Sequence, residues 1–525
     1  MRRFTLASIL LMTTSAAMAQ TSRGDAWWSH VETLASDDMK GRMTGTADYL
    51  RAADYVIAQF KALGLEPAGT DGYLQPVALV EQTILADQSR ASLKGPGGTI
   101  PLAVPGDIII SGGGGPAPAK VDAKLVFAGY GLSIPEAGHD DFAGLNLKGK
   151  IVVVISGGPT SISGALKSHA RSERTKILSA RGAAGIITLT TAKQTEIPWA
   201  RRKLLATQPA MYLADAALRD AARPMMSAML DGEKAEALFA GSGHSFAELS
   251  KLADASQPVP TFTLKPRLQA EIAAKRSDVS SPNIIARLPG SDPTLAAENV
   301  VVSAHLDGLG VGQPINGDSI YNGALDNASG VASVIEIAKA LRAQGAKPRR
   351  SILFTIVTAE EKGLLGSRYF ASRPSVPKAS IVADLNFDMA LPIFPLTGVT
   401  ALGAPESSLG KDAEAIGATM GLPLAPDPLP DRNVFVRSDQ YSFIREGVPS
   451  LFFKYGFALG TPEAEIERKW RANVYHSPSD DPQQPVLKDE AVKLNDYVAA
   501  LTLRVADSDT RPSWNADSFF ARFAK

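Results

Sequence analysis

Three short apolar runs between residues 300 and 388 each end in side chains that can bind a metal or move a proton. The runs N-V-V-V-S-A, S-I-L-F-T-I-V-T-A and I-V-A-D-L-N-F are followed, in turn, by His305-Leu306-Asp307, Glu360-Glu361 and Asp388. Between the first two runs, Asp326-Asn327 precede a helical stripe of Val331, Val334, Ile335, Ala338 and Leu341. Strands alternating with a helix predict an α/β protein with a mixed, mostly parallel sheet flanked by helices. Ligands of such sheets bind beyond the carboxyl ends of the strands, where these polar residues fall.

The apolar pattern changes along the rest of the chain. Helical spacing predicts helices over Asp48–Leu63 and around Ala491–Leu501. From Asp87 to Pro258, Gly- and Pro-rich turns separate short β-like runs, which predicts an inserted β-rich domain. Alternating residues at Leu268–Ile272 and a second run at 283–288 predict a hairpin before the strand at Val300. The predicted order is residues 20–86 and 259–508 for the main domain, 87–258 for the insertion, and 509–525 for a C-terminal tail.

The amino-acid composition excludes several classes of function. Lys+Arg and Asp+Glu both number 54, so no basic surplus points to nucleic acid. The sequence contains no cysteine, which excludes disulfides, thiolate metal sites and cysteine nucleophiles. A metal site in this chain must therefore be built from imidazole and carboxylate groups.

The N-terminus has the layout of a secretory signal. Arg2-Arg3 precede an apolar run from Phe4 to Ala17, and Ala17-Met18-Ala19 closes it. This predicts a signal peptide over residues 1–19, cleavage near Ala19, and export to the periplasm or the medium. No later stretch approaches about 18 apolar residues without charges, so no membrane span is predicted.

Each polar residue at these strand ends, taken alone, can be explained either by a catalytic or metal-binding role or by a purely structural one. His305 and Asp307 leave the same face of a strand, so the carboxylate can hold the second imidazole nitrogen of a metal-bound histidine. Adjacent Glu360 and Glu361 project in different directions, which lets one bind metal while the other handles a proton. An H-x-D triplet is nevertheless common by chance, consecutive acids are common on solvated faces, and Asp326 has the position of a helix N-cap.

Their order along the chain is more specific. His305, Asp326, Glu360-Glu361, Asp388 and Tyr475-His476 together resemble the motifs of the co-catalytic di-zinc exopeptidase family. That family includes secreted bacterial aminopeptidases, glutamate carboxypeptidase and an inactive receptor branch. The segment L-A-S-D-D-M-K-G-R at residues 34–42 shares the resemblance, which implies a zinc-peptidase, phosphorylase/hydrolase-like fold. V-F-A-G-Y-G at 126–131 and the D-D-F-A-G-L segment from 140 resemble a protease-associated domain, which the insertion would then be.

The resemblance also implies roles for individual residues. Two Zn²⁺ ions per chain would be bound, one by His305, Asp326 and Asp388, the other by Asp326, Glu361 and His476. The implied catalytic residues are Glu360 as general base toward a metal-bridging water, Tyr475 as the group that stabilises the tetrahedral intermediate, and Asp307 beside His305. Two Zn²⁺, three carboxylates and one hydroxide make a neutral set of ligands, which a buried site tolerates best. A cis peptide between Asp326 and Asn327 is implied as well.

The expected function is an exported aminopeptidase that removes N-terminal residues from peptides. A carboxypeptidase or dipeptidase on the same scaffold is an alternative, and it would need a cationic pocket, for which Arg432, Arg437 and Lys454 are available. A non-catalytic receptor-like ectodomain should have lost ligands, whereas every position is filled. Gly308 and Gln440 stand where bacterial relatives often have histidine, which leaves side-chain specificity undetermined. The sequence does not predict an oligomeric state.

Overall fold

The computed structural model describes residues 23–195, 197–221, 223–432 and 434–524. The predicted signal peptide at 1–19 lies outside these residues. The chain divides into two compact units, one formed by residues up to 77, 280–430 and 437 onward, the other by 78–279 and 431–436. The crossings at 77/78 and 279/280 fall inside the strands β2 (Leu74–Ile84) and β14 (Ala274–Leu288). No linker marks either crossing, so composition alone places the borders elsewhere, at 86/87 and 258/259.

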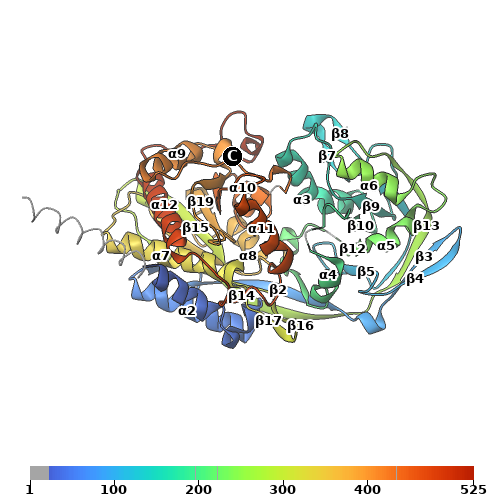
Figure 1. Ribbon diagram of the computed structural model, residues 1–525, viewed down its shortest axis with the longest axis horizontal. Helices are drawn as coiled ribbons and strands as arrows, with labels where there is room; N and C mark the ends of the chain where they lie inside the picture. Colours follow the sequence, from blue (N-terminus) through green and yellow to red (C-terminus); the bar gives the residue numbers. More distant parts are fainter. Residues whose placement is uncertain (1–22, 196, 222, 433, 525) are drawn as a thin grey trace, which may run out of the picture. The chain divides into compact units, whose positions relative to one another are not determined.

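The first unit is built on a mixed sheet whose central strands are parallel (Figure 1). The part of this sheet that carries the site has the order β14-β18-β15-β19-β21-β20. Its strands are β18 at Ser351–Val357, β15 at Asn299–His305, β19 at Ile381–Phe387, β21 at Ser450–Tyr455 and β20 at Val399–Leu402. The pairs β18/β15, β15/β19 and β19/β21 are parallel, whereas β14 and β20 pair antiparallel at the two sides. The predicted strands that precede His305, Glu360 and Asp388 are therefore confirmed as parallel neighbours.

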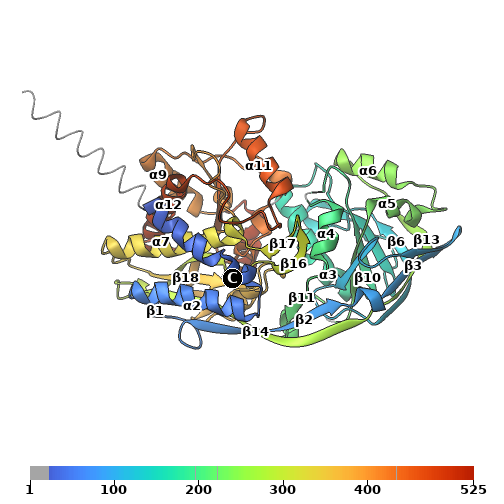
Figure 2. The same ribbon diagram turned by 60° about the horizontal axis from the view of Figure 1, so that its bottom comes forward.

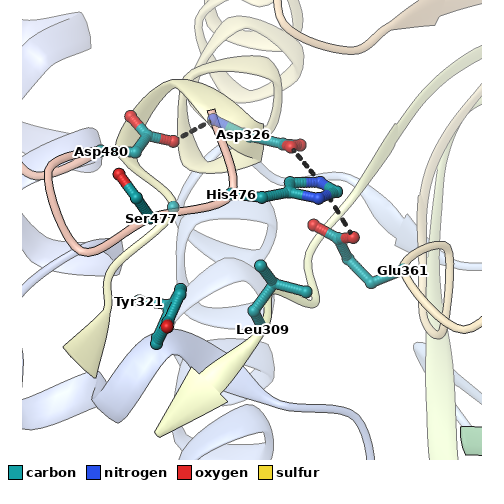
Figure 3. A pocket seen from close by; sticks show the side chains of 8 residues that line it. Leu309, Tyr321, Asp326, Glu361, His476, Ser477 and Asp480 are labelled. Atoms are coloured by element: carbon teal, nitrogen blue, oxygen red, sulfur yellow. Dashed lines mark hydrogen bonds and ion pairs between the residues drawn. The ribbon is translucent and has the colours of Figure 1, made fainter. Parts of the chain in front are cut away.

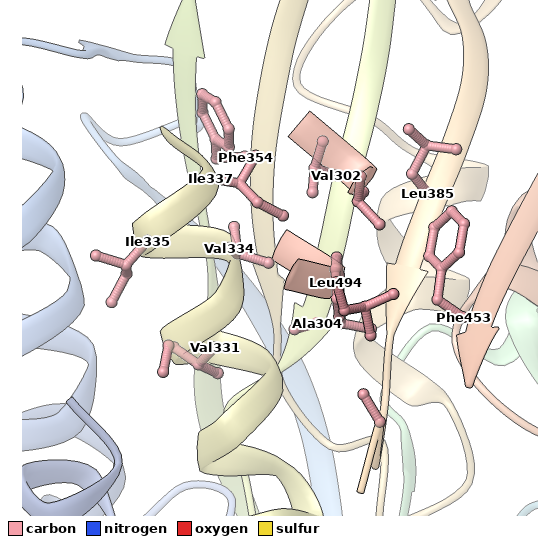
Figure 4. Packing of buried hydrophobic residues seen from close by; sticks show 14 of the residues in the cluster. Val302, Ala304, Val331, Val334, Ile335, Ile337, Phe354, Leu385, Phe453 and Leu494 are labelled. Carbon is pink, nitrogen blue, oxygen red and sulfur yellow. The ribbon is translucent and has the colours of Figure 1, made fainter. Parts of the chain in front are cut away.

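Both faces of this sheet are buried. Successive residues of β15 point to opposite faces, and the residues on each face lie in a hydrophobic core. The larger of two hydrophobic cores lies on one face, where Val300 and Val302 pack with α7 (Ser329–Ala343) and α12 (Lys488–Asp507). Figure 4 shows this packing for Val302, Val334 and Leu494. Val301 packs on the other face with Phe370 of α8 (Leu365–Ser372) and Phe443 of α10 (Gln440–Arg445). Figure 1 shows α12 and α10 on opposite sides of β15 and β19. Burial on both faces explains the continuous apolar runs in the sequence.

The larger core also includes residues from a helix at 23–34 and from α2 (Ala47–Ala62). Thr46 caps α2 by accepting from the Tyr49 N–H, and the helix buries Tyr49, Val56 and Phe60. The helices predicted over Asp48–Leu63 and around Ala491–Leu501 are thus confirmed as α2 and α12.

The predicted hairpin before Val300 is wrong. Residues 261–271 form β13, which pairs with β3 and β6, whereas β14 pairs with β18 and lies in a different sheet. The alternation at Leu268–Ile272 correctly indicates a half-buried strand, but alternation does not identify the partner of a strand. Two consecutive strands here belong to different sheets.

The second unit has its own eight-stranded sheet in the order β4-β3-β13-β6-β9-β10-β12-β5 (Figure 2). Its strands are β3 (Arg90–Gly95), β4 (Gly98–Leu102), β5 (Ile108–Gly112), β6 (Lys120–Ala128), β9 (Ile151–Ile155), β10 (Gly185–Leu189), β12 (Met226–Leu230) and β13 (Thr261–Glu271). The helices α3 (Gly164–Ala180) and α6 (Phe246–Asp254) belong to the same unit. Alternate residues of β9 enter two separate cores, Val153 one and Val152 the other. The β-rich character predicted for this part of the chain is confirmed.

The C-terminal tail is attached to the first unit. The Trp514 indole N–H donates to Gly447 O at 3.0 Å, and Phe520 is fully buried. Among the described helices, none is both long and apolar enough to cross a bilayer.

Candidate metal centre

Three neighbouring parallel strands bring the predicted site residues to one edge of the sheet. His305 is the last residue of β15, Asp388 directly follows β19, and Glu360 follows β18 by three residues. The registers His305↔Val357 and Ala304↔Phe387 align these strand ends. Because the ends are aligned, residues far apart in the sequence converge beyond the carboxyl edge.

Asp326 reaches the same edge from the turn at Ala324–Ala328, which leads directly into α7. The Asp326–Asn327 peptide is cis, as the resemblance implied. The Asn327 side chain donates to Phe387 O at 2.9 Å and therefore ties this turn to the end of β19. The N-cap reading of Asp326 is not observed, because α7 begins after Ala328 and has no side-chain cap.

His476 comes from a loop that follows α11 (Pro462–Asn473). It has a left-handed backbone with φ of 54°, an uncommon conformation for a residue other than glycine. The Tyr475 ring lies against the His476 ring, with centroids 3.8 Å apart, and the Arg471 guanidinium lies 5.3 Å from the Tyr475 ring. Burial raises the pKa of the Tyr475 hydroxyl well above its usual value, so this group stays protonated.

The five predicted metal ligands form two groups that share Asp326. His305 Nε2 lies 3.4 Å from Asp326 Oδ1 and 3.7 Å from Asp388 Oδ1. His476 Nε2 lies 3.3 Å from Asp326 Oδ2 and 3.4 Å from Glu361 Oε2. Within each group the candidate ligand atoms all lie within 4.8 Å of one another. The two oxygens of Asp326 thus face different groups, which is the geometry of a bridging carboxylate.

The hydrogen bonding of these residues fits a metal better than a purely structural role. His305 Nε2 and Asp388 Oδ1 are buried and have no hydrogen-bond partner among the described residues. A buried polar atom without a partner is unfavourable in a folded protein, unless an ion or water satisfies it. Imidazole nitrogens and carboxylate oxygens are ligands that zinc takes readily. The residues present therefore fit a zinc ion at each group.

The charges around the centre perturb the protonation of its members. Burial raises the pKa of Glu361 to about 7 and that of Glu360 well above its usual value. Burial alone would also raise the pKa of Asp326, but His305 and His476 hold it well below its usual value. Burial would lower the pKa of His305, yet the carboxylates of Glu360, Asp326 and Asp388 raise it well above its usual value. Without a cation, the cluster therefore retains protons that a metal ion would displace.

Asp307 makes different contacts from those expected of it. His305 Nδ1 lies 3.1 Å from the main-chain oxygen of Asp307, whereas the nearest carboxylate oxygen of Asp307 is 3.9 Å away. The Asp307 carboxylate instead accepts the main-chain N–H groups of Glu360 at 3.0 Å and Glu361 at 3.2 Å, and the Thr44 hydroxyl at 3.1 Å. The expectation that this carboxylate holds the imidazole is thus corrected. Its contacts fix the turn that carries both glutamates.

Two further residues at the centre were missed by sequence reasoning or given another role. Asp480 accepts from the main-chain N–H groups of Leu325 and Asp326, both at 2.9 Å. Lys454 donates to the main-chain oxygens of Asp388 and Met389, so its ammonium is engaged behind a ligand. A lysine inside the buried strand S-L-F-F-K-Y was a signal that a buried partner exists, whereas the S-P-S-D-D-P segment containing Asp480 shows no comparable pattern.

A small pocket adjoins the second ligand group (Figure 3). Asp326, Glu361 and His476 line one side of it, and Leu309, Tyr321, Gly323, Ser477 and Asp480 line the rest. Figure 3 shows His476 between Asp326 and Glu361, with Asp480 on the side of Asp326 away from His476.

Parts of the chain are similar to curated proteins. The chain is 39% identical over 108 residues to leupeptin-inactivating enzyme 1 of Streptomyces exfoliatus, which covers 20% of this chain and 22% of that protein. It is 30% identical over 274 residues to probable leucine aminopeptidase 2 of Aspergillus oryzae, covering 48% and 51%. The chain thus spans about a fifth and about half of the length of these two curated relatives.

Solved structures match over nearly the whole chain. An aminopeptidase from an Aneurinibacillus species aligns with a TM-score of 0.55 at 19% identity, covering 95% of this chain and 98% of that one. A peptidase M28 precursor from Shewanella amazonensis aligns with a TM-score of 0.50 at 18% identity, with the same coverage. At these identities the likeness shows the fold alone. Residues 283–502, which hold all five predicted ligands, match the family model of peptidase family M28, and this part of the chain therefore belongs to that family.

Proposed function

We propose that this protein is an exported zinc aminopeptidase that removes N-terminal residues from peptides. The observation that carries the proposal is the pair of ligand groups sharing Asp326. In them His305 Nε2 and Asp388 Oδ1 are buried, and the described residues offer neither atom a hydrogen-bond partner. Two zinc ions would be held, one by His305, Asp326 and Asp388, the other by Asp326, Glu361 and His476. When bound, such a pair of ions acidifies water and polarises the scissile carbonyl.

Glu360 is the general base of the proposed reaction. Its main chain is held by Asp307, and its carboxylate oxygen Oε2 lies 4.0 Å from His305 Nε2, next to the ligand groups without belonging to either. It takes the proton from the attacking water and returns it to the leaving amine. Burial raises its pKa, which makes the carboxylate a stronger base than an exposed glutamate.

Tyr475 is proposed to stabilise the developing oxyanion. Its ring lies beside His476, and the raised pKa keeps the hydroxyl protonated and able to donate a hydrogen bond. A donor placed where negative charge develops lowers the barrier, and each such donor is commonly worth about 10²–10³-fold in rate.

The direction of cleavage rests on two further observations. The similarity to probable leucine aminopeptidase 2 of Aspergillus oryzae supports removal of N-terminal residues. A carboxypeptidase needs a cation for the substrate carboxylate, but Lys454 already donates to two main-chain oxygens behind Asp388. Carboxypeptidase or dipeptidase activity is the other outcome of the test. Export is proposed from the signal-like residues 1–19 alone.

The direct test is to incubate the zinc-loaded protein with one peptide in three forms, unmodified, N-acetylated and C-amidated, and to read the products by mass. We expect stepwise loss of N-terminal residues from the unmodified and amidated peptides and none from the acetylated one. Protection by the C-terminal amide alone would identify a carboxypeptidase. An absence of cleavage in all three forms would contradict an exopeptidase of either direction.

A further inference from the structure

Arg42 is a fully buried arginine that faces main-chain carbonyl groups instead of an acid. Its guanidinium donates to Leu34 O at 2.5 Å, Asn322 O at 2.7 Å, Gly323 O at 2.9 Å and Leu306 O at 3.0 Å. Among the described residues, all of its hydrogen-bond acceptors are these main-chain oxygens. Burial lowers its pKa to about 10, so the group stays charged at neutral pH.

Three of the four carbonyls bound by Arg42 belong to the two segments that carry His305 and Asp326, which are ligands of the first group. Leu306 lies between His305 and Asp307, so the bond to its oxygen fixes the chain just beyond the end of β15. Asn322 and Gly323 lead into the turn that carries Asp326. The fourth carbonyl, of Leu34, is in the helix at 23–34 and serves as a fixed anchor. One planar group with several donors thus joins both ligand segments to a helix in the core.

The backbone around Arg42 is shaped for this contact. Gly41 has φ of 64°, and a Cβ atom there would lie 2.3 Å from Tyr321 O and 2.8 Å from Gly310 O, so only glycine fits. Arg42 itself has φ of 49°, a left-handed conformation that a non-glycine residue keeps only when its surroundings impose it. The Asn322 side chain returns the contact by donating to Ala35 O at 2.9 Å.

The charge of Arg42 has a second consequence. The carboxylates of Asp480, Asp307, Asp326 and Glu361 all favour its charged form. By reciprocity, a buried positive charge favours the ionised form of those four acids, of which Asp326 and Glu361 are proposed ligands. Arg42 thus offsets part of the repulsion among carboxylates that converge in a buried place.

We propose that Arg42 is a positioning residue, whose guanidinium sets the spacing between His305 and Asp326 and thereby the zinc affinity of the centre. This inference rests on the proposed zinc function. Groups that orient metal ligands from behind typically change metal affinity or activity about 10–100-fold when they are removed.

The test compares the full-length variants Arg42→Met, Arg42→Lys and Arg350→Met with the unmodified protein. Arg350 is the matched control, because it is equally buried in the same unit and donates to Glu298 and to the main-chain oxygens of Val505 and Ser508. Among the described residues, none of its side-chain hydrogen bonds goes to a segment that carries a ligand. Zinc affinity is measured by competition with a chelating dye well below each thermal midpoint, and the visible spectrum of the Co²⁺-loaded protein reports the ligand geometry.

We expect Arg42→Met to weaken zinc binding about 10-fold or more and to alter the Co²⁺ spectrum. Arg42→Lys keeps the charge but has fewer donors, so it should recover part of the affinity. Arg350→Met should lower the thermal midpoint and leave zinc affinity and spectrum unchanged. Should Arg42→Met fail to fold, Arg42→Lys alone decides the matter, since a single ammonium cannot span four carbonyls.

Unchanged zinc affinity in the folded Arg42 variants would overturn the positioning role while leaving the proposed function intact. Equal weakening in Arg350→Met would also overturn it, because the effect would then follow from stability alone. Failure of the unmodified protein to bind zinc would overturn the proposed function and this inference together, and it is visible before any variant is measured.

Discussion

The Asp480 carboxylate holds the main chain of Asp326: Oδ2 accepts the Asp326 N–H at 2.9 Å, and Oδ1 accepts the preceding N–H of Leu325 at the same distance. Gln484 donates to Asp480 from the other side at 2.6 Å. The residue proposed to bridge two metals is therefore oriented by a second, buried acid. Any change in its orientation should affect both metal positions at once.

Asp480→Asn tests this relationship. An amide has only one acceptor oxygen, so one of the two N–H groups would face an NH₂ group, and the turn at Asp326 should shift. We expect zinc binding to weaken about 10-fold or more at both positions, measured by chelator competition. The matched control is the partly buried neighbour Asp481→Asn, whose carboxylate accepts, among the described residues, from the nearby Gln483 N–H and not from the turn at Asp326. Equal affinities in both variants would remove the orienting role of Asp480.

Zinc binding should depend on pH with a defined sign. Burial raises the pKa of Glu361 to about 7; His476 opposes this shift and Asp326 adds to it. Burial would lower the pKa of His305, but neighbouring carboxylates raise it well above its usual value. Zinc must displace these protons, so its affinity should rise as the pH increases from about 5.5 to 7.5, with proton release measurable by calorimetry in two buffers. An affinity independent of pH over this range would contradict the protonation assigned to the cluster.

The raised pKa of Glu361 also makes the stability of the metal-free protein fall as the pH rises, whereas the zinc affinity rises. The folded state holds a proton on Glu361 at a pH where the unfolded chain, with its ordinary pKa of 4.5, has lost it. The stability contributed by that proton is therefore lost as the pH rises from about 4.5 to 7. Zinc-loaded protein should lack this loss, which thermal midpoints with and without zinc would show.

The central strands, and the strand ends at which the candidate ligands lie, were predictable from the sequence. Strands β15, β18 and β19 are buried on both faces, and such strands read as unbroken apolar runs whose ends are easy to locate. The stripe from Val331 to Leu341 predicted α7, because a helix that packs on a sheet repeats its apolar residues every three or four positions. Polar residues placed directly after these elements were then candidates for one site.

Other features left no trace in the sequence. Alternation in β13 did not reveal that it pairs with β3 and β6, because strand partners are chosen by the whole sheet. Asp480 acts through bonds to main-chain N–H groups, which any sequence provides, so no partner residue marks it. The roles of the main-chain oxygen and the carboxylate of Asp307 depend on local dihedral angles that the H-x-D spacing does not fix.

The core of the first unit supports a stability prediction. Leu494 of α12 is 1% exposed and packs in the cluster with Val302 and Phe453 (Figure 4), whereas Leu487, before the same helix, is 42% exposed. Leu494→Ala should cost about 2–5 kcal/mol of unfolding free energy through lost packing and a cavity. Leu487→Ala should change it by less than about 0.5 kcal/mol. Urea unfolding followed by tryptophan fluorescence checks both, and similar costs for the two would contradict the assigned core.

The proposed mechanism makes Glu360 the general base and Glu361 a zinc ligand, so variants of these neighbouring residues test the proposed zinc-peptidase site. Only Glu361 belongs to a ligand group, while the Glu360 carboxylate lies beside the other group. Zinc content and turnover of an unblocked peptide are measured on Glu360→Gln and Glu361→Gln. We predict that Glu360→Gln keeps two zinc ions and loses about 10²–10⁴-fold in rate, whereas Glu361→Gln loses zinc. Loss of zinc in Glu360→Gln with both ions retained in Glu361→Gln, or full activity in both variants, would contradict it.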